Sequence, residues 1–173
     1  MAGIAGICRT GEYELVEKML AKIGHRGPGG QKVIVKNGGV LGVVYREGSR
    51  LPFINRSRWG AVWDGRFSRN LERVETDTPL ALAAIKDGKV LLVRDGLGIS
   101  PLYYGEIDGT LVFASEVKAL VGIVPKVLEF PPGHKYVSGE GFQRFFGLKP
   151  VETWPLPEEE AAHRLRKALE QAV

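Results

Sequence analysis

The chain has 173 residues, of which 44% are hydrophobic and 25% charged, and its formal net charge is +4 at pH 7. This length suits one domain that buries roughly two thirds of its unfolded surface. A single cysteine, Cys8, excludes an internal disulfide and favours a reducing compartment. No apolar run approaches the ~20 residues of a membrane helix, and residues 1–8 lack the basic head of a signal peptide, so we expect a cytoplasmic protein with no membrane partner.

The basic balance is better explained by solvent-exposed side chains than by a nucleic-acid surface. Arginines concentrate over residues 46–73, where they alternate with apolar residues such as Leu51, Trp59 and Trp63. The solvent side of strands and loops has this pattern. No basic helix and no RNA-stacking motif accompanies the arginines. We therefore expect no nucleic-acid partner.

The first part of the chain predicts strands around one helix. Residues 2–8 are small and apolar throughout, which is typical of a strand covered on both faces. Apolar residues then recur at helical spacing over 12–23, and a glycine follows as a natural C-terminal stop. Residues 25–30 are expected to form a loop. β-branched runs on either side of residues 37–39 predict a hairpin, and residues 60–65 predict another short strand that ends in a turn.

The middle of the chain predicts two hairpins joined by a tight corner. The apolar runs 80–85 and 90–93 flank an Asp-Gly turn, which favours the first hairpin. In the corner, RDGLGISP, we expect Asp95-Gly96 and Gly98 to supply positive-φ positions and Pro101 to fix the entry to the next strand. Asp108-Gly109 is the turn of the second hairpin.

The last part of the chain changes character near residue 154. FASEVKAL predicts a short helix, and three short strands are expected between residues 126 and 146. After a linker at Leu156-Pro157, three glutamates occupy the first turn of a helix. One apolar stripe follows on that helix, formed by Ala161, Leu165, Ala168, Leu169 and Ala172.

Five short motifs occur in a fixed order: MAGIAGI, HRGP, RDGLGISPLYYG, FASEVKAL and FPPGHKY. In this order they resemble the N-terminal glutaminase half of glutamine-hydrolysing asparagine synthetases, which are class II, Ntn-type glutamine amidotransferases. The resemblance implies an α+β fold, a four-layer α/β/β/α sandwich of two antiparallel sheets. It also implies an amidotransferase-like domain over 1–154. Residues 155–173 would then be the linker and first helix that lead, in that family, into an ATP-using synthetase domain.

The resembling family uses an N-terminal cysteine as its nucleophile. Removal of the initiator Met uncovers it, the thiol attacks the glutamine side-chain amide, and its own α-amino group acts as the general base. This chain has Ala2 at that position, and a methyl group is no nucleophile. The resemblance places Arg26 of HRGP close to the nucleophile position, whereas a turn with a solvated arginine is the alternative interpretation.

Further substrate positions also depart from the family pattern. The family's Asn-Gly-Glu loop corresponds to Asp64-Gly65-Arg66. Gly65 keeps its backbone N–H, but an ionised Asp64 only accepts hydrogen bonds, and Arg66 reverses the charge expected to meet the substrate ammonium. The family arginine that clamps the glutamine carboxylate aligns with Tyr45. Asp77 matches the second carboxylate for the substrate amine, or is an ordinary turn residue.

These departures favour a naturally decayed glutaminase site. The leading hypothesis is a catalytically inactive amidotransferase domain that serves as a scaffold for an ammonia-using, ATP-dependent amide ligase. One alternative is an active amidotransferase domain that carries an engineered Cys-to-Ala change at Ala2. The other is a stand-alone module that binds an anion between Arg26 and Arg66.

The same reasoning sets the expected ligands and partners. Glutamine should bind weakly or not at all, and no cofactor and no metal is expected. The C-terminal helix should dock on a synthetase domain or subunit, because an isolated helix of this length is marginal in water. Its own sandwich, or a second copy of the chain in a homodimer, are the alternatives.

Overall fold

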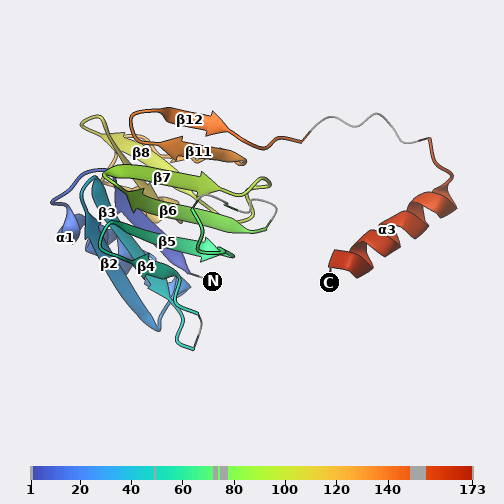
Figure 1. Ribbon diagram of the computed structural model, residues 1–173, viewed down its shortest axis with the longest axis horizontal. Helices are drawn as coiled ribbons and strands as arrows, with labels where there is room; N and C mark the ends of the chain where they lie inside the picture. The colour runs from blue at the N-terminus through green and yellow to red at the C-terminus, as the bar shows by residue number, and fades with distance from the viewer. Residues whose placement is uncertain (1, 49, 72–73, 75–77, 149–154, 173) are drawn as a thin grey trace.

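The computed structural model describes residues 2–48, 50–71, 74, 78–148 and 155–172, and it contains two six-stranded antiparallel sheets. The first sheet holds, in spatial order, β10 (Leu128–Glu129), β8 (Tyr103–Ile107), β9 (Thr110–Ala114), β1 (Gly3–Ile7), β3 (Gly39–Tyr45) and β2 (Gly30–Lys36). The second holds β12 (Gly141–Arg144), β11 (His134–Val137), β7 (Lys89–Arg94), β6 (Leu80–Lys86), β5 (Trp59–Gly65) and β4 (Phe53–Asn55). The sheets lie face to face (Figure 1), so the predicted α+β sandwich is confirmed.

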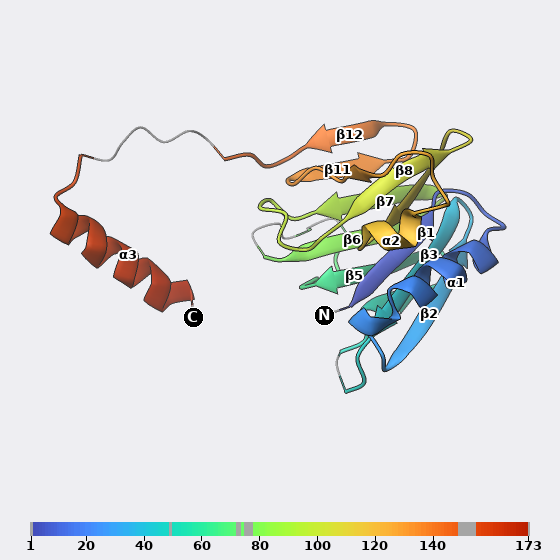
Figure 2. The same cartoon turned by 180° about the vertical axis from the view of Figure 1, so that it is seen from behind.

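Helices cover the outer face of the first sheet. Figure 2 shows α1 (Tyr13–Lys22) and α2 (Val117–Leu120) on that face, and the 3-10 helix η1 (Gly24–Arg26) follows α1 directly. The outer face of the second sheet differs from the four-layer expectation. Among the described residues it is covered by the segment that carries Phe67 and Leu71, instead of by a helix.

The central strand β1 explains why its residues are all small or aliphatic. Ile4 faces the core between the two sheets, whereas Ala5 and Ile7 face the helices. A Cβ on Gly6 would lie 2.5 Å from the Phe113 ring and 2.6 Å from the Val40 carbonyl oxygen. The strand is therefore buried along its whole length, as the sequence pattern predicts.

The corner between β7 and β8 is held by one carboxylate. Asp95 accepts hydrogen bonds from the backbone N–H groups of Ile99 and Ser100 at 2.8 and 2.9 Å. The positive-φ prediction holds for Gly98, whose φ is 69°, but it is wrong for Asp95 and Gly96. Gly96 is required for another reason, because a Cβ there would lie 2.6 Å from the Phe146 ring.

The remaining local predictions agree closely with the structure. Both Asp-Gly hairpin turns have positive φ at each residue, with 50° at Asp87 and 50° at Asp108. The predicted helix over 12–23 is α1, and the three strands predicted between residues 126 and 146 are β10, β11 and β12. Strand β4 and helix η1 were not predicted, because each is only three residues long and shows no period that a pattern could reveal.

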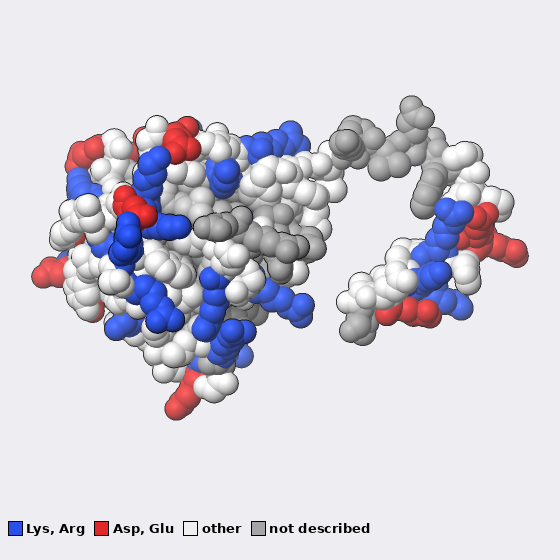
Figure 3. All heavy atoms as spheres, viewed as in Figure 1, with Lys and Arg blue, Asp and Glu red and all other residues white. Residues whose placement is uncertain are grey.

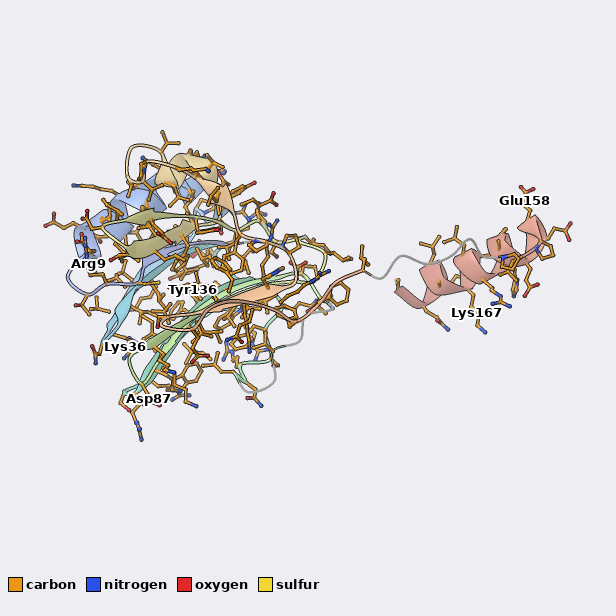
Figure 4. The ribbon with its side chains drawn as sticks, turned by 90° about the horizontal axis from the view of Figure 1, so that it is seen from above. Arg9, Lys36, Asp87, Tyr136, Glu158 and Lys167 are labelled. Carbon is orange, nitrogen blue, oxygen red and sulfur yellow. The ribbon has the colours of Figure 1, made fainter. Side chains whose placement is uncertain are left out.

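The C-terminal helix α3 (Glu158–Ala172) lies apart from the sandwich (Figure 1). Leu165 and Leu169 of its apolar stripe are 62% and 58% exposed. Figure 4 shows its side chains, including Glu158 and Lys167, extending from a helix separated from the sandwich. None of the helices formed by the described residues has the length and apolar character needed to span a bilayer.

The packing of Gly6 yields a stability prediction. Gly6→Ala should lower the melting temperature by about 2 to 12 °C, since an overpacked core costs about 1–3 kcal/mol and each kcal/mol shifts a domain of this size by about 2–4 °C. Gly24→Ala is the matched control, because a Cβ there meets nothing within 4 Å. Thermal unfolding followed by circular dichroism measures both. Equal melting temperatures for the two variants would contradict the described packing of β1.

Candidate functional site

A cavity of about 360 Å³ opens where β1 begins and where β3 and β5 end. Its lining includes most of the site residues expected from the sequence, namely Ala2, Arg26, Tyr45, Asp64 and Gly65. These residues come from both sheets and from η1, so the fold assembles the site from distant parts of the chain. This meeting point is the strongest candidate for a functional site.

The sheet registers explain why these residues meet. Gly3 of β1 pairs with Val44 of β3, which brings the start of β1 beside Tyr45. Across the sandwich, β5 ends with Asp64 and Gly65, paired with the start of β6. The first residue of β1 and the last residues of β5 therefore face one another at the same open end.

Asp64 is the polar centre of the pocket, and both of its carboxylate oxygens accept hydrogen bonds. The backbone nitrogen of Ala2 donates to Oδ1 at 2.8 Å. Arg26 donates through Nη2 to Oδ2 at 2.7 Å. The Asp64 side chain is only 6% exposed, and a buried carboxylate needs such partners to offset its desolvation.

Arg26 connects this carboxylate to the start of β1 and to a surface cluster. Its Nε donates to the carbonyl oxygen of Ala2 at 2.8 Å, and its Nη1 lies 3.3 Å from the carboxylate of Glu116. The Arg26 side chain is 11% exposed. It therefore lies against Ala2 and Asp64, and it is no solvated loop residue.

Glu116 continues the network toward the surface. Its Oε1 lies 2.9 Å from Nε2 of His25, and its Oε2 lies 3.3 Å from the ammonium of Lys118. Partial burial raises the pKa of Glu116, but hydrogen bonds from Lys118 and Arg26, with the charges of His25 and Lys118, outweigh burial and hold this pKa below its ordinary value. Glu116 is thus a carboxylate at neutral pH, and Arg26 lies between two anions.

Arg66 is placed differently from the sequence expectation. It is exposed and is not among the residues that line the pocket. The reason is the preceding residue: Gly65 has a φ of 98°, and a Cβ there would lie 2.0 Å from the Pro79 carbonyl oxygen. The chain turns away at this glycine, and the Arg66 backbone nitrogen then donates to Pro79. Asp77, the other expected amine partner, lies outside the described residues.

Some of the residues that line the pocket were not predicted from the sequence. Arg50 and Pro52, between β3 and β4, line one wall, and Ile99, Ser100 and Pro101 line another. The corner motif RDGLGISP contains the second group, but its glycines and proline point only to a turn. Arg50 lies outside every motif, and only the fold brings it to the pocket.

The single cysteine lies away from the pocket. Cys8 follows the far end of β1 from Ala2 and packs against the inter-sheet core. Burial raises the pKa of its thiol to about 12, so it is a neutral thiol at physiological pH, and the thiolate is the reactive form. Among the described residues there is also no group of His, Cys, Asp and Glu placed to hold a metal ion.

The molecular surface carries charged side chains of both signs. On the face in Figure 3, lysine and arginine side chains are spread over the sandwich with acidic side chains between them, and α3 carries both signs. Inside the pocket, Asp64 and Arg26 satisfy each other. The arrangement can hold a ligand in a preformed cavity, to whose lining Ala2 contributes a methyl group.

Comparisons with known proteins agree with this geometry. Residues 68–145 match the model of a family described as glutamine amidotransferase domain. Asparagine synthetase [glutamine-hydrolyzing] 2 of Arabidopsis thaliana is 46% identical over 57 residues, which cover 32% of this chain and 10% of that protein. Asparagine synthetase of Zea mays is 40% identical over 91 residues, 51% of this chain and 15% of that protein.

Solved structures show the same fold at low sequence identity. The glutamine phosphoribosylpyrophosphate amidotransferase of B. subtilis superposes with a TM-score of 0.64 at 15% identity, covering 82% of this chain and 48% of that one. A second structure, described as the allosteric regulatory enzyme of purine biosynthesis, gives a TM-score of 0.62 at 16% identity, with the same coverage of 82% and 48%. In its ordered motifs, its asparagine synthetase relatives and its two-sheet fold, the chain is similar to the glutamine amidotransferase domain of asparagine synthetases.

Proposed function

We propose that this domain no longer hydrolyses glutamine and instead serves as a folded scaffold for an ammonia-using, ATP-dependent amide ligase. The observation that carries the proposal is the contact between Ala2 and Asp64. A methyl group stands at the nucleophile position, and the carboxylate beside it accepts hydrogen bonds at both oxygens. An oxyanion needs donors at this place, and an ionised carboxylate offers none.

The number of departures supports natural decay over one engineered change. Replacing cysteine by alanine in an intact site would leave the other substrate positions as the family has them. In this chain Asp64 has a specific structural partner in Arg26, at 2.7 Å, and Tyr45 occupies the position of the carboxylate clamp. Positions 64 and 45 thus depart from the family pattern in addition to position 2. Sequencing the natural gene through codon 2 separates the two readings directly.

The proposed partner is a synthetase domain or subunit, in the same compartment. The relatives that match are synthetases, of which this chain covers only 10% and 15%, so their activity and partners are proposals for this chain. Helix α3, within the proposed C-terminal segment 155–173, offers the docking element. Leu165 and Leu169 are not buried against the described part of the sandwich. An apolar stripe stabilises a helix only when another surface covers it. A cytoplasmic location belongs to the same proposal.

The first prediction is that this chain releases no ammonia from glutamine. No side chain at Ala2 can form the thioester, and the Cys8 thiol is buried and neutral. A coupled glutamate dehydrogenase assay with a heat-inactivated control measures the release. Turnover above that control would refute the proposed loss of activity.

The second prediction concerns repair of the site. Ala2→Cys alone should restore little activity, because Asp64 still opposes an oxyanion. Adding Asp64→Asn should raise the rate at least tenfold over Ala2→Cys, since one oxyanion donor is worth on the order of 10² to 10³ in rate. The same ammonia assay measures both, and Ala2→Cys with Asp108→Asn, on a surface turn, is the matched control. Family-like turnover in the single Ala2→Cys variant would favour the engineered interpretation.

The third prediction concerns α3. Leu165→Asp with Leu169→Asp should weaken binding to a separately expressed synthetase half by at least roughly tenfold, because each buried leucine is worth about 1.5–3 kcal/mol. The melting temperature of the sandwich should not change. His163→Asp with Gln171→Asp adds the same charge outside the stripe and is the control. Unchanged binding in the leucine variant, measured by calorimetry, would remove α3 as the docking element.

A further inference from the structure

The two buried charged side chains of the pocket, Arg26 and Asp64, are paired with each other. Arg26 and Asp64 form an ion pair of 2.7 Å with side chains 11% and 6% exposed. The second Asp64 oxygen holds the backbone nitrogen of Ala2, and the remaining Arg26 nitrogens hold Glu116 and the Ala2 carbonyl oxygen. Neither side chain therefore offers a free charge to a ligand.

Arg50 is the remaining charged residue of the described lining, and its charge is not paired. It reaches the pocket from the loop between β3 and β4 and is exposed to solvent. Across the described ranges, no carboxylate forms an ion pair with its guanidinium. A guanidinium presents several donors in a planar fork that matches a carboxylate in a bidentate manner. The described pocket therefore carries one unit of positive charge available to a ligand.

Apolar side chains make up much of the rest of the lining. They belong to Tyr45, Pro52, Pro79, Ile99 and Pro101. A cavity of about 360 Å³ is near the lower limit for small-molecule sites. It suits a short aliphatic body that carries a single anionic end.

An ammonium group on the ligand would find no partner among these described residues. Asp64, the carboxylate that lines the cavity, is held by Arg26 at 2.7 Å. A further cation placed near Arg26 and Arg50 would be repelled by like charge. A ligand with a carboxylate but no amine matches the pocket better than an amino acid does.

We propose that the pocket binds a small organic monocarboxylate that lacks an α-ammonium group, with its carboxylate on Arg50. The ligand proposal rests on the proposed function in one respect, namely that the pocket binds its ligand without hydrolysing it. The site so defined is distinct from the expected anion site between Arg26 and Arg66, because Arg26 is paired and Arg66 lies outside the cavity.

Isothermal titration calorimetry with three matched probes tests the proposal. Glutaramate is glutamine without its α-amino group, and glutaramide is the same molecule with the carboxylate converted to an amide. Glutaramate should bind with a dissociation constant of roughly millimolar order, as expected for one charge-assisted contact at a partly exposed site. Glutamine should bind at least about fivefold more weakly, and glutaramide should give no saturable signal.

Two variants test whether Arg50 holds the ligand carboxylate. Arg50→Gln should weaken glutaramate binding by roughly five- to tenfold or more. Arg66→Gln removes the same charge outside the cavity and should leave binding unchanged. Circular dichroism verifies that both variants are folded.

Several results would overturn the inference. They are no glutaramate binding at tens of millimolar, glutamine binding as tightly as glutaramate, or equal binding by the Arg50→Gln variant and the unmodified chain. Ammonia release measured in parallel keeps the two proposals separate. Release would refute the proposed loss of hydrolysis, whereas absence of both release and binding would refute only the ligand.

Discussion

The constraint on which the structure depends is the double-sided burial of β1. This strand lies between β9 and β3, with the second sheet on one face and α1 on the other. Only small or aliphatic residues fit there, and Gly6 has no room for a methyl group. Because packing fixes β1 along its whole length, it also fixes Ala2, the residue just before the strand, at one end of the sandwich. Ala2 lines the pocket at that end.

The ion pair of Arg26 and Asp64 links the two sheets at the end of the sandwich where the pocket lies. Arg26 comes from η1 beside the first sheet, and Asp64 comes from β5 of the second. Together with the two bonds to the backbone of Ala2, they join both sheets through one buried polar network. Such a network is stabilising only when every member is satisfied. Each oxygen of Asp64 has a partner, so this requirement is met for the carboxylate.

Sequence reasoning was strongest where a residue's local chemistry determines its conformation. The Asp-Gly turns at 87–88 and 108–109 were predicted because positive φ favours these residues. The ordered motifs led to the family and to the positions of Ala2, Arg26, Tyr45 and Asp64. Gly96 was misread, because its requirement comes from Phe146, some fifty residues later in the chain. Arg50 was not singled out, and Arg66 was expected at the substrate, because only tertiary structure decides which arginine reaches a cavity.

The buried network has an evolutionary consequence. An amide at residue 64 would leave Arg26 with one carboxylate neighbour, Glu116 at 3.3 Å, and a buried pair that loses one partner is destabilised by about 3 to 5 kcal/mol in measured cases. Since natural domains have only about 5–15 kcal/mol of stability, selection would oppose that substitution. The Arg26–Asp64 pair therefore restricts which residues position 64 can accept, whatever chemistry the pocket performs.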